Sequence, residues 1–230
     1  QDLIDNESIY YAGELGLRPP ESIKQNALEA DLVICVGHKL NGIPNMGYTF
    51  PTKTQKFIHV LPDKDGLNKL FRTDIAVVSS GENFLQKLND THYLFNNNDL
   101  WVNKCHKRYI DNKATQNIRK ASDGLDFGAI IDELAIQAPE DSIITNDAGN
   151  FTSWMHHRFP FKSKMKLIGS EIGAMGMGIP AGIAASLRNI DKKTFVIVGD
   201  GGALMTGSEL ATAVLKKANI IIIVANNNHY

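Results

Sequence analysis

The stretch VGDGGALMTGSEL at residues 198–210 and the stretch VANNNHY at residues 224–230 decide how this chain is expected to fold. Each follows a short apolar run, TFVIVG at 194–199 and IIIIVA at 220–225. Two such strands, joined by the helical pattern at 206–217, predict a parallel β-α-β unit that is covered on both faces. Both strands then end at the same edge of the sheet, where open α/β folds bind their ligands.

Polar residues follow both strands at this edge. Asp200 comes directly after the first strand, and Asn227 follows the second. A carboxylate, an amide oxygen and nearby backbone carbonyls form an all-oxygen set of the kind that suits Mg²⁺. A tight turn and an asparagine-rich loop explain each stretch taken alone. The two together, at the ends of consecutive strands, favour a cation site.

Glycines beside Asp200 predict a phosphate site next to the cation. Gly199, Gly201 and Gly202 let the backbone approach a ligand closely and direct N–H groups at it. The run from Thr206 to Glu209 fits a capping box for the following helix, whose amino end would favour phosphate. The pattern therefore indicates a magnesium-bridged diphosphate.

Composition excludes several classes of protein. The 230 residues carry a formal charge of −1 and are 43% hydrophobic, so nothing indicates a nucleic-acid or membrane partner. The longest apolar run, Ile220–Ala225, is too short to span a bilayer. The cysteines Cys35 and Cys105 do not suggest a disulfide framework, which favours the cytoplasm.

The rest of the chain predicts two open parallel-sheet α/β domains. Residues 1–92 form the first, incomplete at its N-terminus, and residues 125–230 form the second, incomplete at its C-terminus. The polar segment 93–124 is expected to link them, with a helix near 101–110. The expected strands are 32–36, 56–61, 74–78, 142–146, 165–169, 194–199 and 220–225. The other expected helices start near residues 20, 81, 127, 179 and 206.

A second glycine cluster, GSEIGAMGMGIPAG at 169–182, has the outline of a dinucleotide fingerprint. The true fingerprint begins directly at a strand end, but here the strand stops near Ile168 and Gly176 comes well after it. The spacing also differs, with Pro180 inside it. The cluster therefore favours close helix packing over a nicotinamide site.

The chain resembles the thiamine diphosphate enzymes, most closely the acetolactate synthase, pyruvate oxidase and benzoylformate decarboxylase group. GDGGALMTGSEL followed by ANNNHY resembles the family's Gly-Asp-Gly to Asn-Asn signature. GSEIGAMGMGIPAGIAASL and TNDAGNFTSW resemble two further family stretches, and GELG, ALEADLVICVG and KFIHVLPD resemble its middle domain. The resemblance covers nearly the whole chain, and implies a Rossmann-like middle domain followed by the thiamine diphosphate-binding fold.

The resemblance also implies residue roles. Asp200 and Asn227 would bind Mg²⁺ through side-chain oxygens, and His229 through its backbone carbonyl. The Gly173 carbonyl would accept a hydrogen bond from the pyrimidine amino group. Met175 would be the apolar wedge beneath the thiazolium, against the alternative of an ordinary core methionine. The cofactor's diphosphate would be lined by Gly149, Asn150, Phe151, Gly199, Gly201 and Gly202.

The implied reaction is decarboxylation of a 2-oxo acid, with transfer or release of the product. In this family an activating glutamate comes from a pyrimidine-binding domain, usually of a partner subunit. That domain is expected to be absent here, so the fragment alone should be inactive and the whole enzyme a homo-dimer or tetramer. No catalytic acid or base is therefore assigned within this chain.

Departures from the family pattern limit the choice of substrate. Acetolactate synthases carry GQHQMWAAQ where this chain has GNFTSWMHH, and Gly202 stands where serine is usual. His156 and His157 are read as a solvated or structural pair. Two alternatives stay open: a non-catalytic subunit with this fold, and an unrelated Mg²⁺-dependent phosphate-binding protein. Some relatives hold FAD in the middle domain, but these residues do not indicate a flavin.

Overall fold

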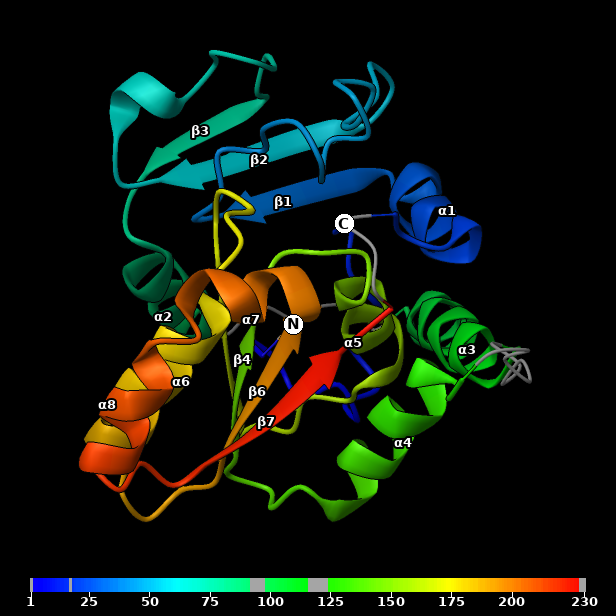
Figure 1. The fold of residues 1–230 in the computed structure, drawn as a ribbon. Helices are drawn as coiled ribbons and strands as arrows, with labels where there is room; N and C mark the ends of the chain where they lie inside the picture. The colour runs from blue at the N-terminus through cyan, green and yellow to red at the C-terminus, as the bar shows by residue number, and fades with distance from the viewer. Residues whose placement is uncertain (1, 17, 92–97, 116–123, 228–230) are drawn as a thin grey trace. The chain divides into compact units, whose positions relative to one another are not determined.

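The computed structural model describes residues 2–16, 18–91, 98–115 and 124–227 (Figure 1). The chain forms two compact units. The smaller unit comprises residues 12–112, and the larger unit comprises residues 1–11 together with residues 113–230. Helix α3 crosses the boundary between them, and each unit has a parallel sheet of its own.

The smaller unit is a three-stranded parallel sheet in the order β1-β2-β3. Its buried cluster contains Cys35, Leu40 and Phe57. Ser80 caps α2, since its side chain accepts a hydrogen bond from the N–H of Asn83. The elements, in chain order, are α1 (Glu21–Glu29), β1 (Leu32–Val36), β2 (Lys56–Leu61), the 3₁₀ helix η1 (Lys64–Gly66), β3 (Ile75–Val78), α2 (Gly81–Asp90) and α3 (Asp99–Thr115).

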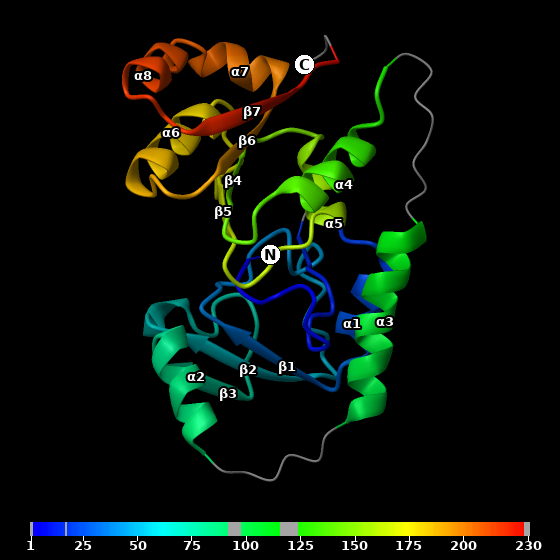
Figure 2. The ribbon, with the colours of Figure 1, turned by 90° about the horizontal axis from the view of Figure 1, so that it is seen from below.

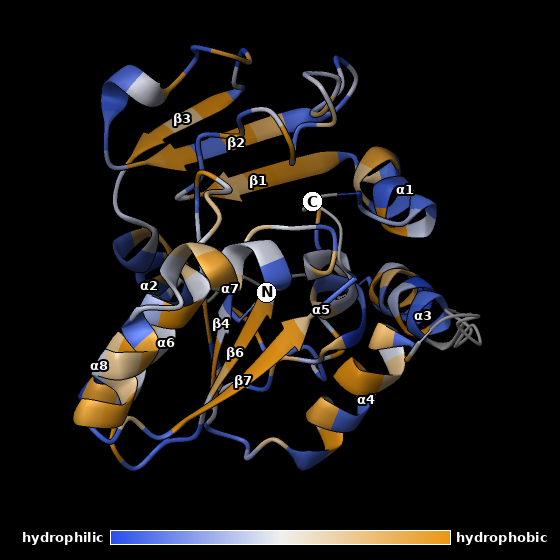
Figure 3. Ribbon diagram, viewed as in Figure 1, coloured by the Kyte–Doolittle hydropathy of each residue, from blue (hydrophilic) through white to orange (hydrophobic). Residues whose placement is uncertain are grey.

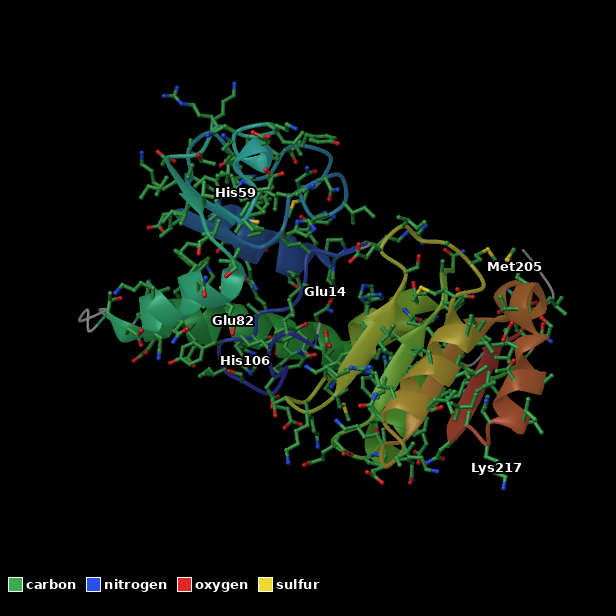
Figure 4. All side chains as sticks on the ribbon, turned by 90° about the vertical axis from the view of Figure 1, so that its left-hand side faces the viewer. Glu14, His59, Glu82, His106, Met205 and Lys217 are labelled. Atoms are coloured by element: carbon green, nitrogen blue, oxygen red, sulfur yellow. The ribbon has the colours of Figure 1, made fainter. Side chains whose placement is uncertain are left out.

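An exposed ion-pair cluster ties α1 to α3 within the smaller unit. Arg108 Nη2 lies 2.8 Å from Glu29 Oε1, and Lys104 Nζ lies 2.6 Å from Glu29 Oε2. The hydrogen bonds from Arg108 and then Lys104 lower the pKa of Glu29 to about 2. Inside the sheet, His59 is buried and its Nε2 lies 2.9 Å from the His38 carbonyl oxygen (Figure 4).

The larger unit is a four-stranded parallel sheet in the order β5-β4-β6-β7. Helices α6, α7 and α8 lie on one face of this sheet, and α4 and α5 lie on the other (Figure 2). The elements, in chain order, are α4 (Phe127–Gln137), β4 (Ile143–Asn146), α5 (Thr152–Arg158), β5 (Lys166–Gly169), α6 (Gly178–Arg188), β6 (Thr194–Gly199), α7 (Asp200–Thr206), α8 (Glu209–Leu215) and β7 (Ile220–Ala225).

Burial on both faces explains why the central strand β6 is almost entirely apolar (Figure 3). Ile144 and Ile197 pack with Ile131 and Phe159 in the cluster beneath α4 and α5. Val196 and Val198 alternate to the opposite face and pack with Ile179 and Ile183 of α6. Alternate side chains of β6 therefore contribute to the two hydrophobic clusters on opposite faces of the sheet.

The first residues of the chain belong to the larger unit. The N–H of Asn6 donates to the Phe161 carbonyl, and the Phe161 N–H donates to Asn6 Oδ1, both at 2.9 Å. Asp2 Oδ2 accepts a hydrogen bond from the N–H of Leu167 on β5 at 3.0 Å. The N-terminal segment thus satisfies a backbone donor of the edge strand β5.

The predicted class, an α/β protein with two parallel sheets, is confirmed. The prediction of a single helix at 206–217 with a capping box at Thr206 is wrong. Helix α7 begins at Asp200 and ends at Thr206, and α8 begins at Glu209. The sequence predicts no helix between β6 and Thr206 and offers a tight turn at Gly-Asp-Gly, but Gly201 and Gly202 lie buried in the first turn of α7, where close packing leaves little room for side chains.

Candidate cofactor site

The carboxyl ends of β4, β6 and β7 lie next to one another at one edge of the larger sheet (Figure 1). In the parallel register, Asn146 pairs with Ile197, and Gly199 pairs with Ala225. Adjacent strands are about 4.8 Å apart, so the segments after β4 and β7 each start about 5 Å from the end of β6 and about 10 Å from each other. This edge holds most of the residues predicted to bind the cofactor.

Asp200 opens α7 directly after β6. Gly199 is the N-cap residue in an extended conformation, and no side chain caps the helix there. One carboxylate oxygen, Asp200 Oδ1, accepts a hydrogen bond from the N–H of Gly201 at 3.0 Å. Asp200 is half-exposed, while Gly201 and Gly202 are buried. The first turn of α7 thus places the solvent-accessible carboxylate of Asp200 next to the buried backbone of Gly201 and Gly202.

Asn227 lies two residues beyond the end of β7 and is exposed. The sheet order puts it at the same edge as Asp200, as the sequence spacing predicts. His229, the third predicted metal ligand, lies outside the described residues. Among the described residues, no group of three His, Cys, Asp or Glu side chains could hold a metal ion. The predicted metal ligands are not such a group, because they combine one carboxylate with a side-chain amide and a backbone carbonyl.

The segment after β4 brings Gly149, Asn150 and Phe151 to this edge. Gly149 and Asn150 are exposed. The Phe151 ring packs against the core beneath α4 and α5 and meets Phe127 edge-on, with 6.4 Å between ring centroids. A Cβ at Gly199 would lie 3.0 Å from Phe151 Cε1, and a Cβ at Gly149 would lie only 2.4 Å from it. A side chain at Gly149 would therefore clash with the ring, and one at Gly199 would require the ring to shift by a few tenths of an ångström.

The loop between β5 and α6 carries Gly173 and Met175. Gly173 has a φ of +69°, and a Cβ there would meet no atom within 4 Å, so the loop borders open space at this point. Met175 is 41% exposed, so it does not belong to the buried core of the described residues. Its role as a wedge under the thiazolium stays a prediction.

Gly176, next to Met175, is packed on α7. Its φ is +89°, in the left-handed region that favours glycine. A Cβ there would lie 3.2 Å from Met205 Cβ and 3.3 Å from Thr206 Cγ2. Figure 4 labels Met205 on α7, the helix that Asp200 opens. The loop with Met175 and the helix with Asp200 are therefore in direct contact.

Asp147 is a residue of this edge that the sequence interpretation missed. It follows β4 directly and is only 2% exposed. Its carboxyl oxygens accept hydrogen bonds from the N–H groups of Gly176 and Met177. The available signal was its position, since Asp147 follows its strand as directly as Asp200 follows β6.

His156 and His157 are predicted to be a solvated or structural pair and not metal ligands. They occupy the last turn of α5 together with Arg158, where cations interact favourably with the helix dipole. Arg158 is buried, and its guanidinium pairs with the Asp132 carboxylate on α4. The hydrogen bond from Arg158 to Asp132 raises the pKa of Arg158. The ion pair also joins this end of α5 to α4.

Two segments of the chain match domains of a known protein family. Residues 1–88 match the central domain of the thiamine pyrophosphate enzymes, and residues 147–230 match their C-terminal TPP binding domain. The chain belongs to this family, and thiamine pyrophosphate is another name for thiamine diphosphate.

Several similar curated proteins are acetolactate synthases. The large subunit from Lactococcus lactis subsp. lactis is 29% identical over 219 residues, which is 94% of this chain and 37% of that protein. The isozyme 1 large subunit from Escherichia coli K12 is 29% identical over 94% of this chain and 38% of its own length. The catabolic enzyme from Raoultella terrigena is 28% identical over 96% of this chain and 40% of its own length. The chain therefore spans about two fifths of the length of these relatives.

No helix within the described ranges combines the length and the hydropathy needed to cross a bilayer.

Proposed function

We propose that this chain provides the diphosphate- and Mg²⁺-binding part of a thiamine diphosphate-dependent enzyme. The observation that carries the proposal is the juxtaposition of Asp200 and Asn227 at the ends of two hydrogen-bonded strands, β6 and β7. Asp200, Asn227 and the carbonyl of His229 would supply the oxygen ligands that Mg²⁺ prefers. A metal ion held by these residues would supply positive charge beside the diphosphate of the cofactor.

The glycines of this edge fit a bound diphosphate. No side chain caps the start of α7, and Gly199 has no Cβ to screen the N–H groups of that turn. Gly149 and Asn150 are exposed on the neighbouring segment and would complete the lining, with the Phe151 ring as its apolar wall. Backbone donors of this kind hold phosphate without adding a competing side-chain charge.

The remaining residues would hold the two rings of the cofactor. Gly173 would present its carbonyl to the pyrimidine amino group, and the exposed Met175 would support the thiazolium from below. When bound, thiamine diphosphate supplies the carbanion and the electron sink for cleavage of a 2-oxo acid. The protein's part is to bind the cofactor, orient it and keep it bent.

The proposed reaction is decarboxylation or carboligation of a 2-oxo acid, as in an acetolactate synthase-like lyase or transferase. We place the activating glutamate outside these 230 residues, on a partner subunit of a homo-dimer or tetramer. Both cysteines are free and buried, which supports the predicted cytoplasmic location. The family assignment removes the alternative of an unrelated phosphate-binding protein, and a non-catalytic subunit is the remaining competitor.

Cofactor titration of the protein made from its complete coding sequence tests the proposal. We expect thiamine diphosphate to bind only when Mg²⁺ is present, and at least about tenfold more tightly than inorganic pyrophosphate. Equal affinity for the two, or binding unaffected by chelation of the metal, would contradict the proposed site. Release of carbon dioxide from pyruvate, 2-oxobutyrate or phenylglyoxylate then separates an enzyme from a non-catalytic subunit.

A further inference from the structure

Two side chains hold one glycine of the loop between β5 and α6 from opposite sides. Asp147 Oδ2 accepts the N–H of Gly176 at 2.9 Å, and Thr206 Oγ1 donates to the Gly176 carbonyl at 2.9 Å. Asp147 Oδ1 also accepts the N–H of Met177 at 3.2 Å. Both peptide groups that flank the Gly176 Cα are therefore fixed, one by β4's end and one by α7.

Burial makes the Asp147 contacts difficult to replace. The side chain is 2% exposed and forms no ion pair among the described residues, so the backbone N–H groups are its main polar partners. Its carboxyl group also fills the space beside α7. A Cβ at Gly202 would lie 2.0 Å from Asp147 Oδ2, and a Cβ at Gly178 would lie 3.1 Å from Asp147 Cβ.

The segments that Asp147 and Thr206 join are those that carry the proposed cofactor contacts. Gly176 directly follows Met175, the proposed support of the thiazolium. Thr206 ends the helix that Asp200 opens, so the same short element carries the proposed metal ligand and a bond to the loop. A shift of Gly176 would therefore move Met175 relative to Asp200.

We infer that Asp147 and Thr206 are positioning residues that set the distance between the ring-binding loop and the diphosphate-binding turn. They hold Gly176 in its left-handed conformation, which fixes where Met175 meets the cofactor. Neither residue needs to touch the cofactor for this role. The inference rests on the proposed function, because it assigns Met175 and Asp200 to the two ends of the same bound molecule.

Three variants of the protein made from its complete coding sequence separate this role from general stabilisation. Asp147→Asn keeps the size of the side chain but leaves one acceptor oxygen for two N–H groups. Thr206→Val keeps the shape and removes the donor. Thr212→Val on α8 is the matched control, because its hydroxyl bonds to Glu209 within the same helix and does not reach the loop.

We expect Asp147→Asn and Thr206→Val each to weaken Mg²⁺-dependent thiamine diphosphate binding about tenfold, and Thr212→Val to leave it unchanged. Their combination should lose less than the product of the single losses, because both bonds hold Gly176. At saturating cofactor, the near-ultraviolet circular dichroism of the bound cofactor should still differ from wild type. A purely structural role would lower the melting temperature and leave that spectrum unchanged.

Hydrogen exchange without cofactor gives an independent outcome. The amides of Gly176 and Met177 should exchange about tenfold faster in Asp147→Asn, and not in Thr212→Val. If wild type fails to bind thiamine diphosphate, the proposed function is wrong, while exchange still shows whether Asp147 holds the loop. If wild type binds and both loop variants bind with its affinity and spectrum, the positioning role is overturned.

Discussion

The two sheets have the same parallel topology but use the polar groups at their carboxyl edges differently. In the smaller unit these groups satisfy neighbouring backbone: Ser80 caps α2, and His38 Nδ1 accepts the N–H of Leu40 two residues away. In the larger unit, Asp147 bonds to N–H groups 29 and 30 residues along the chain. The helix after β6 begins at Asp200, and its N-cap residue, Gly199, has no side chain to cap it.

This contrast teaches that topology alone does not locate the site. Both edges are carboxyl ends of parallel strands, where ligands bind in open α/β folds. In the larger unit, Gly199 and Gly202 pack against the side chains of Phe151 and Asp147, and the half-exposed Asp200 opens the helix between them. The composition of the edge, rather than the order of its strands, distinguishes the proposed site.

The ion pairs of the two units also differ, because the buried Arg158 pairs with Asp132 in the larger unit, whereas Glu29 pairs with its partners at the surface of the smaller unit. The largest effect of a substitution on stability is therefore expected in the larger unit. Asp132→Ala should destabilise it by about 3 kcal/mol, because the buried Arg158 guanidinium loses its carboxylate. Denaturant unfolding measured through Trp154, in a Trp101→Phe background, reports on this unit. The exposed neighbour Glu133 provides the control, and Glu133→Ala should change stability by less than about 0.5 kcal/mol. Equal effects of the two substitutions would remove this contrast.

An intermediate effect is expected where the smaller unit caps its helix. Ser80→Ala removes the oxygen that accepts the Asn83 N–H at 3.2 Å and should cost about 1 kcal/mol. Unfolding measured through Trp101, with Trp154→Phe, would detect it. Ser80→Asp retains a capping oxygen and should remain close to wild type. A loss as large as that of Ser80→Ala in this second variant would show that the cap is not the cause.

The smallest effect should come from the exposed pair in the smaller unit. The pKa of Glu29 is lowered from 4.5 to about 2, so its ionised form stabilises the folded state. That contribution is present above pH 4.5 and is lost as the pH falls toward 2. Glu29→Gln should therefore lower stability at neutral pH and flatten its dependence on pH between 4.5 and 2.

The exposed Glu82 on α2 serves as the control for Glu29 (Figure 4). Glu82→Gln removes a carboxylate that takes no part in the Arg108 and Lys104 contacts, and should keep the wild-type stability at neutral pH. A Glu29→Gln variant with the wild-type slope over this range would show that the Arg108 and Lys104 contacts do not stabilise the fold.

The sequence predicts the sheets well because their strands are short apolar runs that end at polar residues. Strands 194–199 and 220–225 have the bounds that their apolar runs predict, although only 194–199 is buried on both faces and the edge strand 220–225 stays partly exposed. The split into α7 and α8 was missed. The glycines that look like a loop are in fact tolerated in a first helical turn, and Thr206 ends a helix instead of starting one.

The candidate site was predictable only in part. Asp200 and Asn227 follow from strand order, because parallel strands bring their carboxyl ends together. The role of Asp147 did not follow, because its partners lie in a distant loop whose path no local pattern specifies. Phe151 was expected beside the diphosphate, but sequence could not show that its ring packs against Gly149 and Gly199.

The most direct test of the account compares the two aspartates at opposite ends of β6. Asp191 precedes the strand and is exposed, whereas Asp200 follows it at the proposed site. The dissociation constant of thiamine diphosphate should be measured with saturating Mg²⁺ for Asp200→Ala and Asp191→Ala in the protein made from its complete coding sequence. We predict at least about a 100-fold loss of affinity for Asp200→Ala and wild-type affinity for Asp191→Ala. Unchanged affinity in Asp200→Ala would contradict the central claim.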